Sequence, residues 1–145
     1  MLRVMQHTNQ NFIKSFRDLL VYQNSYEASI IIAKQILPKL PAKEKFDLTD
    51  QLSRSSKAIP RLIAEGYGKK HRKYGFQKYL DDAMAESNET IVSLEHVKDI
   101  YAVEIPTCNQ LIDTYDKTSR QLYKLAEAWN KFKNRSRETS NDTAI

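Results

Sequence analysis

Residues 106–132 read PTCNQLIDTYDKTSRQLYKLAEAWNKF, and this stretch decides the fold class. Its core-type side chains recur at alternating spacings of four and three residues. That is the period of a helix that packs along a supercoiled seam. The pattern predicts one long helix, and Pro106 suits its first turn, where a proline loses no helical hydrogen bond. The positions expected to face the seam are Leu111, Tyr115, Thr118, Leu122, Leu125, Trp129 and Phe132.

Three further segments show the apolar spacing of amphipathic helices. They run from about Phe16 to Leu37, from Lys43 to Gly68 and from Lys73 to Ala102. Short connections between long amphipathic helices favour antiparallel neighbours. The sequence therefore predicts an all-α protein, an antiparallel up-down-up-down four-helix bundle. The first helix is expected to bury Phe16, Leu19, Leu20, Tyr26, Ile30, Ala33 and Leu37.

The second of these segments contains a proline, two glycines and several small residues. Pro60 lies inside it and predicts a kink, because a proline removes one helical hydrogen bond. Gly66 and Gly68 predict a C-terminal cap. The small residues would permit close approach of a neighbouring helix; they are Ser53, Ser55, Ser56 and Ala58.

The bundle is expected to span residues 13–132, with flexible segments at 1–12 and 133–145, where apolar periodicity is absent. The longest unbroken apolar stretch, residues 30–33, is far shorter than the roughly 20 residues of a membrane span. The N-terminal residues do not resemble the apolar region of a signal peptide. We therefore expect a cytoplasmic protein without a membrane partner.

The composition excludes several kinds of chemistry. A single cysteine, Cys108, excludes an internal disulfide and a cysteine-based metal site, and we expect it to be a small buried residue. No histidine follows a glutamate by three residues, so the Glu-x-x-His motif of di-iron bundles is absent. Glu86 and Glu89 are interpreted as surface or interface carboxylates. We find no catalytic constellation and expect a non-enzymatic protein with no metal and no cofactor.

The charges are segregated along the chain, whose net charge is +5. Residues 54–73 hold seven basic residues and one acidic one, whereas residues 81–104 hold seven acidic residues and one basic one. Such segregation can attract a polyanion, or it can let the basic face of one subunit meet the acidic face of another. Tyr67 and Tyr74 are candidates for stacking on bases. The candidate nucleic-acid-binding residues are Arg61, Lys69, Lys70, Arg72 and Lys73.

Several motifs resemble those of the 23S ribosomal RNA intervening-sequence protein family, also called the S23 family, which consists of small bacterial four-helix bundle proteins. Residues 16–23, FRDLLVYQ, are similar to its opening motif. Residues 48–56 and 76–83 resemble its next conserved stretches. The most distinctive match is the Ile-Pro to Glu-Gly block, in which Leu62 stands where the family usually has Asn. The residues that carry this block are Ile59, Pro60, Ile63, Ala64, Glu65, Gly66 and Gly68.

This resemblance implies a ring-shaped homopentamer. The related accessory variability protein of diversity-generating retroelements implies nucleic-acid binding through a basic surface, with a reverse transcriptase as a protein partner. The favoured function is therefore a non-enzymatic oligomeric bundle that binds RNA or DNA. The alternative is a protein-interaction scaffold whose charged faces serve subunit assembly or partner recruitment.

Overall fold

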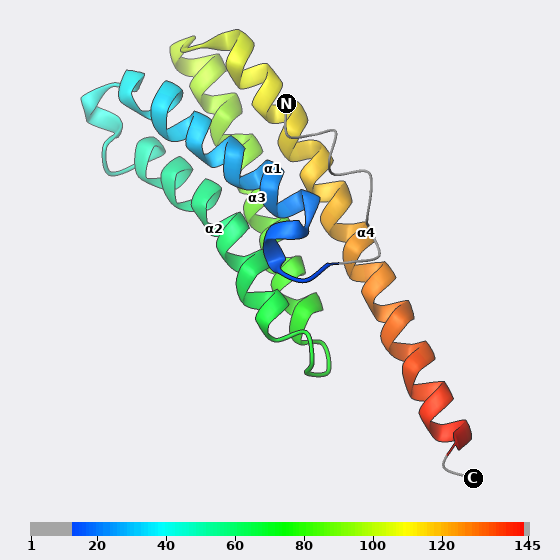
Figure 1. Cartoon of the computed structure of the whole chain (residues 1–145). Helices are drawn as coiled ribbons and strands as arrows, with labels where there is room; N and C mark the ends of the chain where they lie inside the picture. Colours follow the sequence, from blue (N-terminus) through cyan, green and yellow to red (C-terminus); the bar gives the residue numbers. More distant parts are fainter. Residues whose placement is uncertain (1–12, 144–145) are drawn as a thin grey trace.

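The computed structural model describes the backbone of residues 13–143 and the side chains of residues 13–131. Within that range all regular structure is helical, and four long helices pack against one another (Figure 1). The prediction of an all-helical protein is therefore confirmed for the described part of the chain, which contains no strand. The four helices are α1 (Leu20–Ile31), α2 (Leu48–Gly68), α3 (Gly75–Tyr101) and α4 (Ile105–Thr143).

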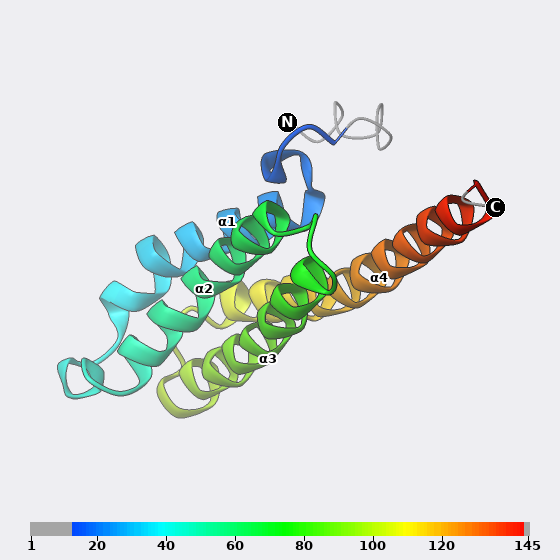
Figure 2. The ribbon, with the colours of Figure 1, turned by 90° about the horizontal axis from the view of Figure 1, so that it is seen from below.

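Helix α3 lies between α2 and α4 and packs along both of them, while α1 contacts α2 and α4. The C-terminal part of α4 extends past the other helices (Figure 2). The backbone stays helical to Thr143, beyond Phe132, where the predicted helix ended. The predicted flexible segment at 1–12 lies outside the described residues.

The predicted seam of α4 faces the core. Leu111, Tyr115, Thr118 and Leu122 are buried, and Leu125 and Trp129 pack against the core from partly buried positions. The side chain of Phe132 lies outside the described residues. The remaining core comes mainly from α2 and α3, which contribute Leu48, Leu52, Ile59, Ile63, Phe76, Leu80, Leu94 and Val97. Helix α2 continues through the buried Pro60.

The first predicted helix is broken into several pieces. A 3-10 turn (Phe16–Asp18) precedes α1, and a π-helical segment (Ile32–Ile36) follows it. Between the 3-10 turn and α1, Leu19 is extended, with φ −73° and ψ 123°. This break lets Leu19 enter the core separately and sets which side of α1 faces inward.

The predicted apolar stripe of α1 was consequently wrong at Leu20, Tyr26 and Ile30, which are exposed. Two serines are buried on this helix instead. Ser25 Oγ donates to the carbonyl of Tyr22 at 3.1 Å, and Ser29 Oγ donates to that of Tyr26 at 2.6 Å. Because these hydroxyls bond to their own helix, small polar residues can face the core without an unpaired donor. The residues that α1 and the following segment bury are Val21, Ser25, Ala28, Ser29, Ile32 and Ile36.

The two glycines of α2 do not form the predicted cap, since neither has a positive φ. A Cβ atom on Gly66 would lie only 2.6 Å from Cβ of Tyr79 on α3. Gly66 therefore allows the two helices to approach each other closely. A Cβ atom on Gly68, the last residue of α2, would meet nothing within 4 Å.

A layer of hydroxyl groups joins three helices inside the core. Thr90 Oγ1 on α3 lies 2.9 Å from Ser55 Oγ on α2. Ser87 Oγ donates to the carbonyl of Tyr115 on α4 at 2.9 Å and accepts from Ser119 Oγ at the same distance. Burying these hydroxyls is tolerable because each has a partner.

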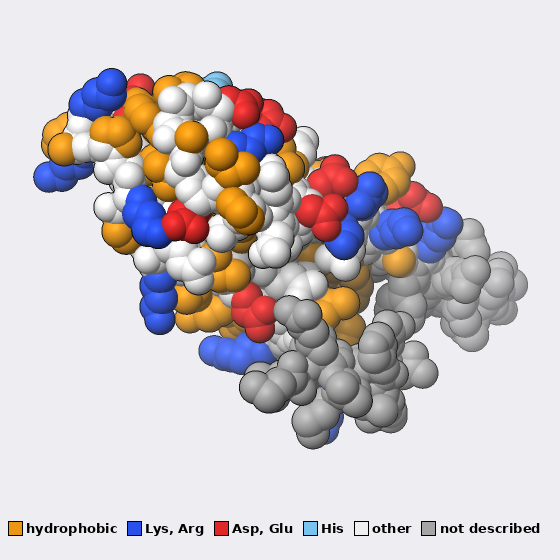
Figure 3. Space-filling model, turned by 90° about the horizontal axis from the view of Figure 1, so that it is seen from above, with side chains coloured by type: hydrophobic (Ala, Val, Ile, Leu, Met, Phe, Trp, Pro, Cys, Tyr) orange, Lys and Arg blue, Asp and Glu red, His pale blue; other side chains and the backbone are white. Residues whose placement is uncertain are grey.

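The outer surface is mixed in character. Seen from above, charged side chains of both signs alternate with scattered hydrophobic ones (Figure 3). Scattered exposed apolar residues are usual for folded proteins. None of the described helices combines the length and apolar content that crossing a bilayer requires.

Candidate nucleic-acid interface and a polar groove

Residues 69–74 form a compact loop between α2 and α3. The amide of Arg72 donates to the carbonyl of Lys69, and the amide of Gly75 donates to that of Arg72, each at 3.0 Å. Tyr74 has a left-handed φ of 59°. A Cβ atom on Gly75 would lie 2.1 Å from the Lys69 oxygen, so only glycine fits where the loop meets α3. The loop is therefore a defined turn.

This loop brings four of the five candidate basic residues together: Lys69, Lys70, Arg72 and Lys73. Lys70 is half-buried, and the other three side chains are exposed. None of the four forms an ion pair with a described residue. The fifth candidate, Arg61, lies apart on α2, at the edge of the groove described below.

Three aromatic rings hold the lysines of the loop. Lys70 Nζ lies 3.6 Å from the ring centroid of Tyr67, and Lys73 Nζ lies 5.4 Å from that of Tyr74. Lys69 Nζ donates to Tyr79 Oη at 2.5 Å. Cation–π contacts of this kind restrain an ammonium group while leaving its charge uncancelled. Tyr67 is thus occupied by a lysine, while Tyr74 is well exposed.

Helix α4 passes beside this loop. Trp129 packs edge-on against Phe76 at a centroid distance of 5.1 Å, and Phe76 in turn contacts Tyr67 at 5.9 Å. Further back on α4, Lys117 pairs with Asp113 and Arg120 pairs with Asp116, at 3.0 and 3.1 Å.

The charge of α4 changes along its length. Glu127 pairs with Lys131 at 3.3 Å. After Glu127 the sequence has no acidic residue before Glu138. That stretch contains Lys131, Lys133, Arg135 and Arg137, so α4 becomes basic beyond the point where it passes the loop.

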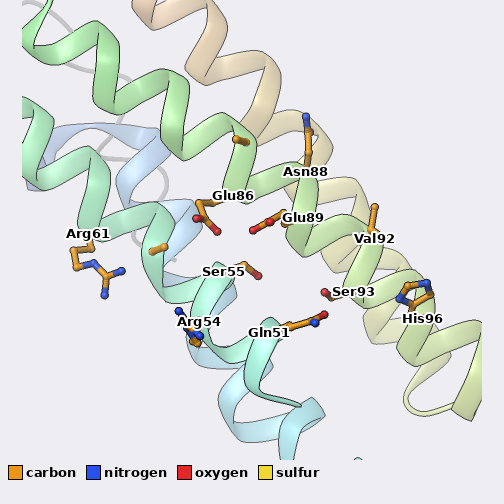
Figure 4. A pocket seen from close by; sticks show the side chains of 12 residues that line it. Gln51, Arg54, Ser55, Arg61, Glu86, Asn88, Glu89, Val92, Ser93 and His96 are labelled. Atoms are coloured by element: carbon orange, nitrogen blue, oxygen red, sulfur yellow. The ribbon is translucent and has the colours of Figure 1, made fainter. Parts of the chain in front are cut away.

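A second feature, a groove of about 760 Å³ between α2 and α3, was not identified from the sequence. Figure 4 shows side chains from both helices turned into it. Its floor is made of small residues, and its rims are charged. It is lined by Gln51, Arg54, Ser55, Ala58 and Arg61 from α2 and by Ala85, Glu86, Asn88, Glu89, Val92, Ser93 and His96 from α3.

Two carboxyl groups meet in this groove. Burial raises the pKa of Glu86, and the hydrogen bond with Glu89 and its charge raise it further. The charges of Arg61 and Arg54 act in the opposite direction. Two adjacent carboxyl groups favour sharing a proton over ionising together. No group of three or more His, Cys, Asp or Glu residues in the described part could hold a metal ion.

Cys108 is buried, as expected. Its Sγ donates to the carbonyl of Val103 at 3.4 Å. Burial, aided by the charge of Glu104, raises the pKa of the thiol. A thiol with a raised pKa is a poor nucleophile at neutral pH.

The family model described as 23S rRNA-intervening sequence protein matches residues 17–124. The chain belongs to this family. Among curated proteins, no sequence matches it. The family match ends before Trp129, so the basic residues at the end of α4 lie outside the matched residues.

The structure gives most of the Ile-Pro to Glu-Gly block a packing role. Ile59, Pro60 and Ile63 are buried in α2, and Gly66 lies against α3. Leu62 packs against the core from a partly buried position. Of the other residues in the block, Ala64 is partly buried, and Glu65 and Gly68 are exposed.

Proposed function

We propose that this protein is a non-enzymatic, oligomeric bundle that binds RNA or DNA through the loop of residues 69–74. The observation that carries the proposal is the group of four cations on one compact turn, none of them neutralised by a described acidic residue. Contacts with phosphates supply affinity without reading sequence. RNA is the first ligand to test, since the family is named after an intervening sequence of 23S rRNA.

The loop is suited to this role because its lysine side chains are already restricted before a ligand binds. The aromatic contacts of Lys69, Lys70 and Lys73 already restrict these flexible side chains. Restricting a side chain before binding reduces the entropy lost on binding. The sequence of α4 after Glu127 contributes further basic residues, and Arg61 adds a charge further along α2.

Assembly is part of this proposal. The chain reversals in Figures 1 and 2 support the up-down-up-down order. The basic residues before Lys73 and the acidic ones after Asp81 would let copies meet head to tail in a closed ring, with five copies by resemblance to the family. A cytoplasmic ring would present several loops to one polyanion, which multiplies weak contacts.

The test compares two fourfold variants that lose the same charge. The loop variant carries Lys69→Gln, Lys70→Gln, Arg72→Gln and Lys73→Gln. The control replaces the exposed Lys34, Lys43, Lys45 and Lys57 by Gln. Fluorescence anisotropy with labelled RNA and DNA at several salt concentrations measures affinity and its salt dependence.

For the loop variant we expect the salt slope to fall by about 3, since each lost contact with single-stranded nucleic acid contributes roughly 0.7. The control should change far less. Equal losses in both variants would mean that only net charge matters. Unchanged affinity in the loop variant, with the fold intact by circular dichroism, would refute the proposal.

The alternative function is a protein-interaction scaffold. The observation that favours it is the segregation of basic and acidic stretches, which also suits pairing between proteins. A protein partner that is retained after nuclease treatment, by both the wild type and the loop variant, would favour the scaffold.

A further inference from the structure

The groove between α2 and α3 offers space for an unbranched chain. Its lining contains the buried Ser55 and Ala58 from α2 and the buried Ser93 from α3, and the exposed Ala85 and Val92 lie at its edge. These side chains are too short to fill the space between the helices. The methyl groups of the alanines and of Val92 supply an apolar lining on which an alkyl chain can pack.

Two carboxyl groups and one hydroxyl group of the groove can accept hydrogen bonds. Glu86 and Glu89 point toward one another in Figure 4, and neither forms an ion pair with a described residue. Ser93 follows Glu89 by one helical turn and points into the groove. Its side chain is only 7% exposed, yet its hydroxyl has no hydrogen-bond partner among the described residues. Its Oγ is open to the groove and can accept a hydrogen bond from a bound molecule.

The neighbouring arginines do not supply this cation. Arg54 is engaged by Asp50 at 3.5 Å, and its side chain is 80% exposed. Arg61 is exposed and forms no ion pair with a described residue. Solvent screens the charges of both arginines, so they oppose a cation at the carboxyl pair only weakly.

We propose that this groove binds the guanidinium head of an alkylguanidinium, with Glu86 and Glu89 accepting its N–H groups, Ser93 Oγ accepting another, and the alkyl stem lying over Ala58 and Ala85. A planar guanidinium presents five donors in a fork that matches carboxylates. The head can belong to a free molecule or to an arginine side chain of a second copy of this chain. This binding is separate from the proposed nucleic-acid function.

Agmatine, an alkylguanidinium, is the free probe. We expect saturable binding by the full-length protein, seen as NMR amide shifts centred on residues 85–96 and 51–61. The double variant Glu86→Gln/Glu89→Gln should lose at least tenfold in affinity, and Ser93→Ala should lose several-fold. The matched control is Asp81→Asn/Asp82→Asn, which removes two exposed carboxylates from the same helix and should bind normally.

Binding is also expected to tighten as pH rises through the raised pKa of Glu86, because the cation binds the ionised carboxylate. The other groups that face the pair are Arg54 and Arg61 on α2 and His96 on α3. The variant His96→Gln should keep this dependence. A pH dependence that disappears in His96→Gln would show that it does not come from Glu86.

Sedimentation distinguishes the two sources of the guanidinium. If the head is free, agmatine binds and the assembly state is unchanged. If it comes from a second copy, the Glu86→Gln/Glu89→Gln variant dissociates the assembly and Asp81→Asn/Asp82→Asn does not. The proposal is overturned if agmatine binding does not saturate and the Glu86→Gln/Glu89→Gln variant leaves assembly unchanged. The fourfold loop variant should bind agmatine normally, so the two proposals fail independently.

Discussion

We expect Gly66→Ala to destabilise the protein, although alanine is the better helix former. The added Cβ would lie 2.6 Å from Cβ of Tyr79 and 3.1 Å from Cδ1 of Phe76. Ordinary van der Waals contact begins at 3.4 Å. Cβ of Tyr79 is fixed to the α3 backbone and cannot rotate away. Helices α2 and α3 would therefore have to move apart by roughly 1 Å at this point.

The size of the effect follows from two opposing contributions. Forcing a methyl group into a packed contact costs about 1–3 kcal/mol. Replacing a helical glycine by alanine returns up to about 1 kcal/mol. The net loss is therefore about 1 kcal/mol. Gly68→Ala is the matched control, because its Cβ meets nothing within 4 Å, and it should instead stabilise by about 0.4–1 kcal/mol.

Urea denaturation followed by circular dichroism measures both variants against the wild type. The two midpoints should move in opposite directions, and the free energies of unfolding of the two variants should differ by about 2 kcal/mol. If Gly66→Ala is as stable as the wild type, the close approach of α2 and α3 at Tyr79 is not a constraint. If both substitutions stabilise the protein equally, the higher helix propensity of alanine alone explains their effect.

Three further predictions concern hydrogen bonds and titration. Because the pKa of Glu86 is raised in the folded protein, this group contributes stability at low pH, and that stability is lost as pH rises above the pKa of Glu86 in the unfolded chain. Glu86→Gln should therefore raise the urea midpoint at pH 7 and change it little near pH 4. Tyr101 donates to Glu44 at 2.7 Å and is the main cause of that carboxyl's lowered pKa. The stability that Glu44 contributes is present above the pKa of Glu44 in the unfolded chain and is lost as pH falls. The Tyr101→Phe variant should therefore lose less stability than the wild type on acidification. Thermal melts between pH 7 and pH 3 measure this difference. Ser87→Ala leaves a buried carbonyl of Tyr115 without its side-chain donor and should cost about 1–3 kcal/mol in urea denaturation.

The parts of the fold that the sequence predicted depend on large apolar residues in long helices. The alternating spacing from Leu111 to Leu122 placed the inner face of α4 correctly, because nothing competes with that face for burial. The apolar spacing of residues 43–68 and 73–102 predicted two more helices, and their Leu52, Ile59 and Leu80 are buried. Periodicity is informative where hydrophobic burial alone decides which side of a helix turns inward.

Predictions from apolar spacing were wrong where interactions other than hydrophobic burial decide the packing. The inward face of α1 is set by a chain break at Leu19 and by serines that bond to their own helix, and apolar spacing detects neither. Gly66 was interpreted as a cap because its real constraint, Tyr79, lies on another helix. The loop lysines were identified by composition, whereas the groove acceptors depend on how α2 and α3 pair in space.

The layer of buried hydroxyls has a consequence for how the helices can slide past one another. Hydrophobic contacts tolerate a shift of one helical turn, because one leucine resembles the next. The contacts Ser55–Thr90 and Ser87–Ser119 do not, since a shift of about 5.4 Å would leave several hydroxyls unpaired in the core. These small groups therefore define a single axial alignment of α2, α3 and α4. By doing so they keep the loop at one end of α3 beside the point where α4 leaves the bundle.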